Sequence, residues 1–203
     1  MFDFFAKGGM IVIPILLCSV LALAIFLERI INFVRMRRKG SGLAEKIAYL
    51  LKQGRDKEAL EVANAGDSPM GHVLAQAMEV KNHDRETIET VIVNATEQEV
   101  RELSTYLQAL ATIGNIAPLL GLLGTVIGMI KAFMVIQQMG GKVNAAVLAG
   151  GIWEAMLTTA IGLAVALPTI VAHSYLLAQV ERYEARLQNG SVLFIKALRA
   201  ENE

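Results

Sequence analysis

The chain has 203 residues, and its 19 lysines and arginines balance its 19 aspartates and glutamates. Hydrophobic residues make up 54% of it, charged residues 19%, and the mean hydropathy is +0.47. The charges are segregated, since only Lys131, Lys142 and Glu154 lie between Ala109 and Leu177. This pattern excludes intrinsic disorder and argues against a water-soluble globule. The near-zero net charge also gives no electrostatic footprint for nucleic acid.

The first apolar segment, Met10–Leu27, contains 18 residues and no charge. About 20 apolar residues cross a bilayer core of about 30 Å, so this segment predicts a transmembrane helix. A cleaved signal peptide is the alternative reading. Asp3 offsets Lys7 ahead of the apolar run, and no small-residue cleavage site precedes Glu28. We therefore favour an uncleaved helix.

Two further spans are predicted at Leu110–Ile130 and Gly151–Leu177, and Glu154 is their only certain charge. Both are long enough to cross a bilayer. Pro118 and Pro168 lie inside them, and we expect kinks there, which membrane helices tolerate when neighbours satisfy the freed carbonyl groups. The sequence thus predicts an all-α membrane protein with three transmembrane helices and long helical cytoplasmic extensions.

Basic residues predict the orientation. Only Lys7 precedes the first span, whereas five basic residues follow it: Arg29, Arg35, Arg37, Arg38 and Lys39. The positive-inside rule then places the N-terminus outside the cytoplasm and the C-terminus in the cytoplasm. Four regions are expected: residues 1–39 with the first span, a cytoplasmic helical region at 40–108, the second and third spans with a short periplasmic loop at 109–177, and a cytoplasmic helix at 178–203.

The cytoplasmic region reads as short helices followed by a long one. Amphipathic segments at Leu43–Gln53 and Asp56–Ala65 predict two helices divided at Gly54, and Ser68-Pro69 is a typical helix start.

From Arg85 onward apolar residues recur with a helical period, and no helix breaker appears before Gly114. We expect one helix of about 50 residues that continues into the second span, judged by this periodicity. The tail helix, Ala178 to about Gln188, is expected to end at Asn189-Gly190.

Small residues form one face of each of the last two spans. In the second span they recur every seven residues, at Gly114, Gly121 and Gly128. The third span carries its own series: Ala155, Thr159, Gly162, Ala166 and Thr169. Small faces let membrane helices pack closely. The two spans could use them on each other, but three helices with two such faces also suggest an oligomer.

Glu154 is the feature of the third span that most needs a reason. A charge at mid-bilayer costs about 2.5–3.5 kcal/mol on insertion scales, and such residues often mark an ion or proton pathway. The alternatives are a salt bridge to Lys131 or Lys142, or a carboxylate that reaches toward the interface. On an ideal helix Thr158 lies about 40° around the axis from Glu154, and Thr159 about 140°.

One carboxylate in the predicted spans provides few titratable groups for moving a proton across a membrane. His173, near the cytoplasmic end of the third span, is a candidate accessory group, although a lone histidine there is more often a packing residue. We therefore expect a second subunit to supply another titratable group. Nucleotide-binding, zinc-protease and serine-hydrolase motifs are absent from the sequence, so we expect no enzyme activity, cofactor or metal site.

The sequence PLLGLLGTVIGM at 118–129 and the sequence GIWEAMLTTAIGLAVALP at 151–168 closely resemble the signature of the MotA/TolQ/ExbB proton-channel family. The resemblance assigns the pore residues to Thr125, Glu154 and Thr159. Thr158 is, like His173, a candidate accessory residue, although we expect its hydroxyl to bond to its own helix backbone.

The three-span layout favours the ExbB/TolQ branch of that family. The resemblance then implies a subunit of a motor of the bacterial inner membrane, driven by the proton-motive force. It implies a homo-oligomer, a pentamer, around two copies of a single-span ExbD/TolR-like partner with a membrane Asp, coupled to a TonB- or TolA-like protein. A TolQ-type envelope-maintenance subunit, a gliding or flagellar stator, and a passive scaffold with a structural Glu154 remain alternatives.

Overall fold

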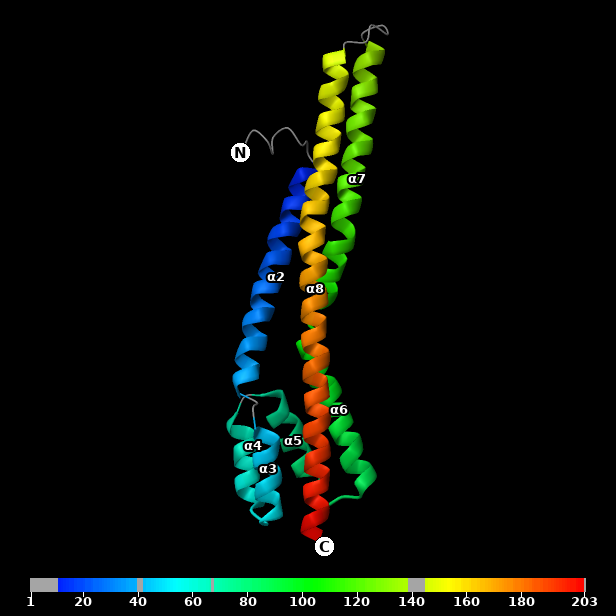
Figure 1. Cartoon of the computed structure of the whole chain (residues 1–203). Helices are drawn as coiled ribbons and strands as arrows, with labels where there is room; N and C mark the ends of the chain where they lie inside the picture. The colour runs from blue at the N-terminus through cyan, green and yellow to red at the C-terminus, as the bar shows by residue number, and fades with distance from the viewer. Residues whose placement is uncertain (1–10, 40–41, 67, 139–144, 203) are drawn as a thin grey trace. The chain divides into compact units, whose positions relative to one another are not determined.

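The computed structural model describes residues 11–39, 42–66, 68–138 and 145–202. Within these ranges the chain is all helical and has no strand (Figure 1). It divides into two compact units: unit 1 holds Met1–Glu28 and Tyr106–Tyr175, and unit 2 holds Arg29–Thr105 and Leu176–Glu203. The helices are α2 (Val12–Lys39), α3 (Leu43–Lys52), α4 (Asp56–Ala65), α5 (Pro69–Glu79), α6 (Arg85–Leu103), α7 (Leu107–Gln138) and α8 (Ala145–Asn202).

Three helices are long and apolar enough to cross a membrane, over Val12–Met36, Leu107–Gln138 and Leu148–Ala200. The predicted three-span, all-α architecture is therefore confirmed in helix length and composition. The residues before Ile11, and the expected loop that contains Lys142, lie outside the described residues.

The apolar helices of unit 1 bury narrow faces and expose broad ones. Val12, Ile15 and Ala22 form the buried face of α2 at helical spacing. Large apolar side chains point outward, and Val20 and Val171 are each 68% exposed. Such surface is unfavourable in water and suits a lipid environment.

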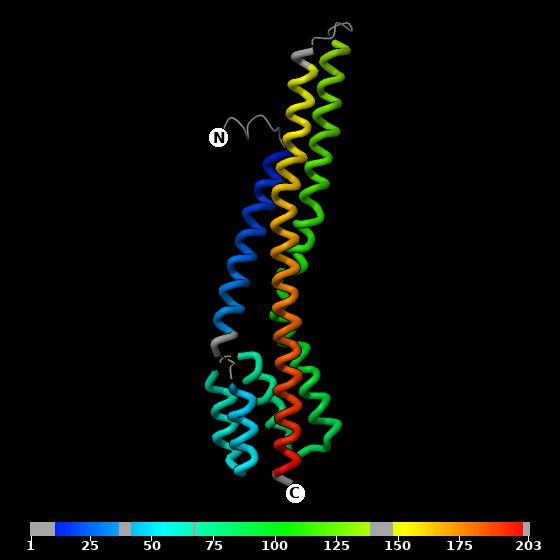
Figure 2. The backbone as a smooth tube through the Cα atoms, in the orientation of Figure 1, coloured from blue at the N-terminus to red at the C-terminus, as the bar shows by residue number. Residues whose placement is uncertain are grey.

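Unit 2 contains the short helices α3, α4 and α5, together with α6 and the C-terminal part of α8 (Figure 2). The predicted helix start at Ser68 is confirmed, because its hydroxyl accepts a 3.2 Å hydrogen bond from the Gly71 backbone N–H and Pro69 is the first helical residue. The core of unit 2 combines apolar side chains from four of these helices: Ile47, Leu51, Val73, Leu74, Ile92 and Phe194.

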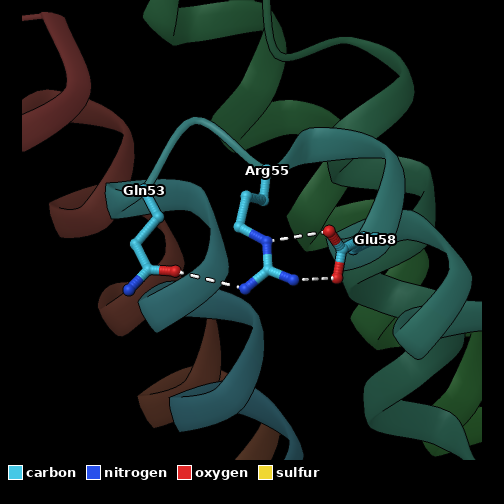
Figure 3. A network of polar contacts seen from close by, with 3 residues as sticks. All are labelled: Gln53, Arg55 and Glu58. Carbon is cyan, nitrogen blue, oxygen red and sulfur yellow. Dashed lines mark hydrogen bonds and ion pairs between the residues drawn. The ribbon is translucent and has the colours of Figure 1, made fainter.

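The turn between α3 and α4 places Gly54 in the left-handed region, with φ of 68°, as the predicted division there requires. Arg55 spans this turn (Figure 3). Its guanidinium donates to the Glu58 carboxylate, with Nε 2.8 Å from Oε1, and Nη1 donates to Gln53 Oε1 at 3.4 Å. These side chains are about half exposed, so the pair contributes little net stability.

The expected continuous helix from Arg85 into the second span is wrong. Helix α6 ends at Leu103, and α7 begins at Leu107 after Tyr106, whose φ is 65°. In an unbroken helix the Glu102 carbonyl would accept from the Tyr106 N–H. Here it accepts instead from Arg29 Nη1 of α2, at 3.3 Å, and from the Thr105 N–H, at 3.2 Å. A tertiary contact from α2 thus lies at the end of a helix that its own sequence does not interrupt.

The expected end of the tail helix at Asn189-Gly190 is also wrong, because α8 continues to Asn202. Gly190 is buried inside unit 2, and a Cβ there would lie 2.5 Å from Met70 Sδ and 3.1 Å from the Ala44 Cβ. The glycine therefore permits a close helix approach and does not act as a helix stop.

Candidate functional site

The third and second spans meet along their small-residue faces inside one chain. A Cβ added at Gly128 would lie 2.9 Å from the Ala155 Cβ, and one added at Gly121 would lie 3.0 Å from the Thr159 Cα. Between these two levels, a Cβ at Gly124 would overlap the side chain of Thr158. Helices α7 and α8 thus pack backbone against backbone over these turns.

The same face extends in both directions from this centre. Gly114 receives Ile170, whose Cγ1 would lie 2.9 Å from an added Cβ, and Gly151 receives the Ala132 Cβ at 2.7 Å. The glycine series is therefore occupied within the chain. The small residues alone do not require a second copy, contrary to one basis of the oligomer expectation.

Three threonine hydroxyls near the centre have different partners. The Thr159 hydroxyl donates to the Gly121 carbonyl of α7 at 2.9 Å, whereas Thr158 donates to the Ala155 carbonyl of its own helix at 2.6 Å. Thr125 likewise bonds within its own helix, to the Leu122 carbonyl at 2.6 Å. The expected backbone bond of Thr158 is confirmed. Thr159 is half-buried at the edge of the interface, and Thr158 is the buried one, 2% exposed.

Glu154 precedes Ala155 and so stands beside the level at which α8 meets Gly128. Its side chain is half-buried. Among the described residues Glu154 forms no salt bridge, and Lys131, one proposed partner, is exposed. The other proposed partner, Lys142, lies outside the described residues. The carboxylate therefore stands without a neutralising cation in this part of unit 1.

His173 lies well apart from these groups. It is half-buried on α8, and its position 19 residues beyond Glu154 corresponds to about 28 Å along the helix axis. Thr125, one turn before Gly128 on α7, stands next to the Gly124 notch that Thr158 fills. The structure thus brings Thr125, Thr158 and Thr159 to neighbouring levels of the α7–α8 pair and leaves His173 outside that group.

The role of Thr158 as the side chain that fills the Gly124 notch was missed from the sequence. The Gly124-x-x-x-Gly128 pattern predicted close packing, but the pattern does not say which side chain enters each notch. The angular argument placed Thr158 beside Glu154, on the basis of one helix alone. Pairing with α7 decides which threonine is buried.

Among the described residues, three helices are long and apolar enough to span a membrane and two of them pack along a glycine face, which indicates a multi-pass membrane protein. Residues 65–189 match the sequence model of the MotA/TolQ/ExbB proton channel family, and the chain belongs to that family.

Curated relatives carry related names. The chain is 33% identical to the biopolymer transport protein ExbB of Salmonella typhimurium, over 87% of this chain and 75% of that protein. It is 30% identical to the ExbB of Pseudomonas putida, over 89% of this chain but 56% of that longer protein. It is 28% identical to an ExbB-like protein of Synechocystis, over 81% of this chain and 79% of that protein.

Proposed function

We propose that this chain is the pore-forming subunit of a motor of the bacterial inner membrane, driven by the proton-motive force, which energises transport through a TonB-type partner. The observation that supports this most directly is Glu154, a half-buried carboxylate on an apolar helix with no salt bridge among the described residues. Membership of a proton channel family supports the proton as the ion that moves. In this proposal the N-terminus is periplasmic and the C-terminus cytoplasmic.

The proton pathway in this proposal runs past Glu154, Thr125 and Thr159, with His173 as an accessory group toward the cytoplasmic end. Hydroxyl groups suit such a path because they hold water without a fixed charge. Each elementary charge that crosses the membrane gains about 2.3 kcal/mol per 100 mV. Thr159 would then serve twice, as a wall of the path and as the bond to Gly121 that holds α7 and α8 together.

We also propose that five copies assemble into a ring around a single-span ExbD/TolR-like subunit whose membrane aspartate carries the proton. The three spans predicted from the sequence contain one carboxylate, Glu154, which supports the need for that second group. The broad apolar surfaces of α7 and α8 supply contact area for neighbours, since Leu119 and Met156 are 61% and 64% exposed. A TolQ-type role, with a TolA-like partner, is the second candidate, because the family contains both branches.

Proton flux into liposomes tests the pathway. The chain is co-expressed with the short reading frame encoded beside it, if that frame holds one N-terminal span with an aspartate, and the purified complex is reconstituted under an imposed membrane potential. Wild type is compared with Glu154→Gln and Thr159→Val, and Thr112→Val is the matched control. The Thr112 hydroxyl is exposed and bonds to the Gln108 carbonyl of its own helix.

We expect the control to conduct like wild type, Glu154→Gln to lose flux, and Thr159→Val to be reduced. Equal flux in all four proteins would overturn the assigned pathway. Complex formation is scored separately by native mass spectrometry, so that a variant that fails to assemble is not mistaken for one that fails to conduct. A complex that forms without any proton flux in the wild type would favour the passive scaffold.

A further inference from the structure

Unit 2 contains a cavity that the proposed function does not use. It has a volume of about 290 Å³ and lies between the start of α6, the loop before it, and the last turns of α8. Its lining residues are Lys81, His83, Arg85, Ile88, Glu89, Ile195, Leu198 and Arg199. The volume is close to the lower end of the range usual for small-molecule sites.

The cavity has an apolar floor and a basic rim. Ile88 and Leu198 are each 8% exposed, and Ile195 is half-buried. These side chains form a surface that favours an apolar group of matching size.

Among the described lining residues, Lys81, Arg85 and Arg199 carry positive charges and Glu89 is the carboxylate. Glu89 accepts a 2.5 Å bond from Arg85 Nε, and Lys81 pairs with Asp56. Arg199, in the last turns of α8, is exposed and forms no ion pair within the part of the chain that the structure describes. His83 faces the same cavity from the loop. Two basic side chains from separate elements thus line the same cavity as the apolar floor.

The backbone N–H groups in the first turn of α6 are not what would attract an anion to this cavity. Asp84 occupies the cap position, and its carboxylate already accepts from the Thr87 N–H at 3.1 Å. An anion in the cavity would therefore be held by side chains. A phosphate suits them better than a carboxylate, because its oxygens can accept from the Arg199 fork and the His83 ring at once.

We propose that this cavity binds a phosphate monoester that carries a small apolar or aromatic group. The phosphate would contact Arg199 and His83, and the apolar group would lie on Ile88, Ile195 and Leu198. A soluble phosphate ester and a lipid headgroup share this chemistry, and the experiment below distinguishes the two sources.

Phenyl phosphate tests the proposal, with inorganic phosphate and phenol as its two halves. Each is titrated by isothermal calorimetry into the full chain in nanodiscs of uncharged lipid. The variants are Arg199→Gln and, as matched control, Lys196→Gln, which lies one turn earlier on α8, is exposed, and does not line the cavity. A second series in nanodiscs with phosphatidic acid tests the lipid source.

We expect saturable binding of phenyl phosphate, at least about tenfold tighter than either half because two favourable contacts combine. Arg199→Gln should weaken it about tenfold, the scale of one charge-assisted contact, while Lys196→Gln should not change it. Absence of saturable binding, or equal affinity in Arg199→Gln, would overturn the site. Displacement of the bound ester by phosphatidic acid would show that a lipid phosphate occupies the cavity, and would overturn a soluble ester as its ligand. Binding is measured without proton flux, so its failure leaves the proposed pathway untouched.

Discussion

The Thr159 hydroxyl of α8 donates a 2.9 Å hydrogen bond to the backbone carbonyl of Gly121 on α7. This bond joins the two helices at a level where the absence of a side chain on α7 exposes its main chain. A residue assigned to the proton pathway is therefore also a structural link.

Removing that hydroxyl should loosen unit 1. Thr159→Val keeps the side-chain shape and loses the donor, and hydrogen bonds between membrane helices contribute about 0.6 kcal/mol on average and up to about 1.7. We expect a lower unfolding free energy in a steric-trapping or denaturant series in detergent. Thr169→Val is the control, since its hydroxyl bonds to the Val165 carbonyl of its own helix. Equal losses in both variants would contradict an interhelical role.

The Gly124 notch should not tolerate a methyl group. Gly124→Ala would bring the new Cβ into the Thr158 side chain, and overpacking of this kind costs about 1–3 kcal/mol. Gly150→Ala is the matched control because nothing lies within 4 Å of its added Cβ. Thermal unfolding in detergent should show a drop for Gly124→Ala alone. The double variant Gly124→Ala/Thr158→Ala should recover part of the lost unfolding temperature. Absence of any recovery would show that the overlap with Thr158 is not the cause of the loss.

We expect the break between α6 and α7 to depend on a contact from another helix. Arg29 is 7% exposed and donates to the Glu102 carbonyl at 3.3 Å. Arg29→Ala should destabilise unit 2 by about 1.5–3 kcal/mol, the range for a hydrogen bond to a charged group. Amide hydrogen exchange at residues 104–107 should change with it. The control is Arg35→Ala, which removes an exposed arginine on the same helix. Unchanged hydrogen exchange in Arg29→Ala would show that the break between α6 and α7 does not depend on the Arg29 contact.

The start of α6 should respond to acid through Asp84. Thr87 donates its hydroxyl at 2.7 Å and its N–H at 3.1 Å, and these bonds hold the pKa of Asp84 below its ordinary value of 3.8. A carboxylate with a lowered folded-state pKa stabilises the fold above the unfolded value, and the contribution is lost as pH falls through the folded one.

Asp84→Ala should therefore unfold at a lower temperature than wild type at pH 7, and the gap should close as pH falls below 3.8. Asp84→Asn keeps a capping oxygen that does not titrate, so its unfolding midpoint should lack this acid-dependent loss. Circular dichroism melts across pH measure all three proteins. A gap for Asp84→Ala that stays constant with pH would show that the cap acts without its charge.

Features governed by local sequence were predictable. The three spans follow from uninterrupted apolar length, the Ser68 cap from a hydroxyl before proline, and the turn at Gly54 from a glycine between two amphipathic segments. These depend on neighbours in the chain, which a sequence displays directly.

Features governed by distant residues were not predictable. Arg29 bonds to the last turn of α6 from 73 positions away, and Gly190, inside a continuous helix, packs against Met70. At the site, each helix alone gave the correct small face, but only the pairing shows that Thr158 enters the Gly124 notch. In such cases a glycine indicates that another helix packs closely against it, but the sequence does not identify the residue that makes the contact.

The seven-residue recurrence of Gly114, Gly121 and Gly128 restricts how α7 and α8 can move. Each glycine meets a different residue of α8, so sliding one helix along the other would set side chains against backbone that has no room for them. The next register that offers glycines again is seven residues away, about 10 Å of travel. Sliding of α7 along α8 by less than this distance is therefore sterically unfavourable, so we expect the two helices to move together.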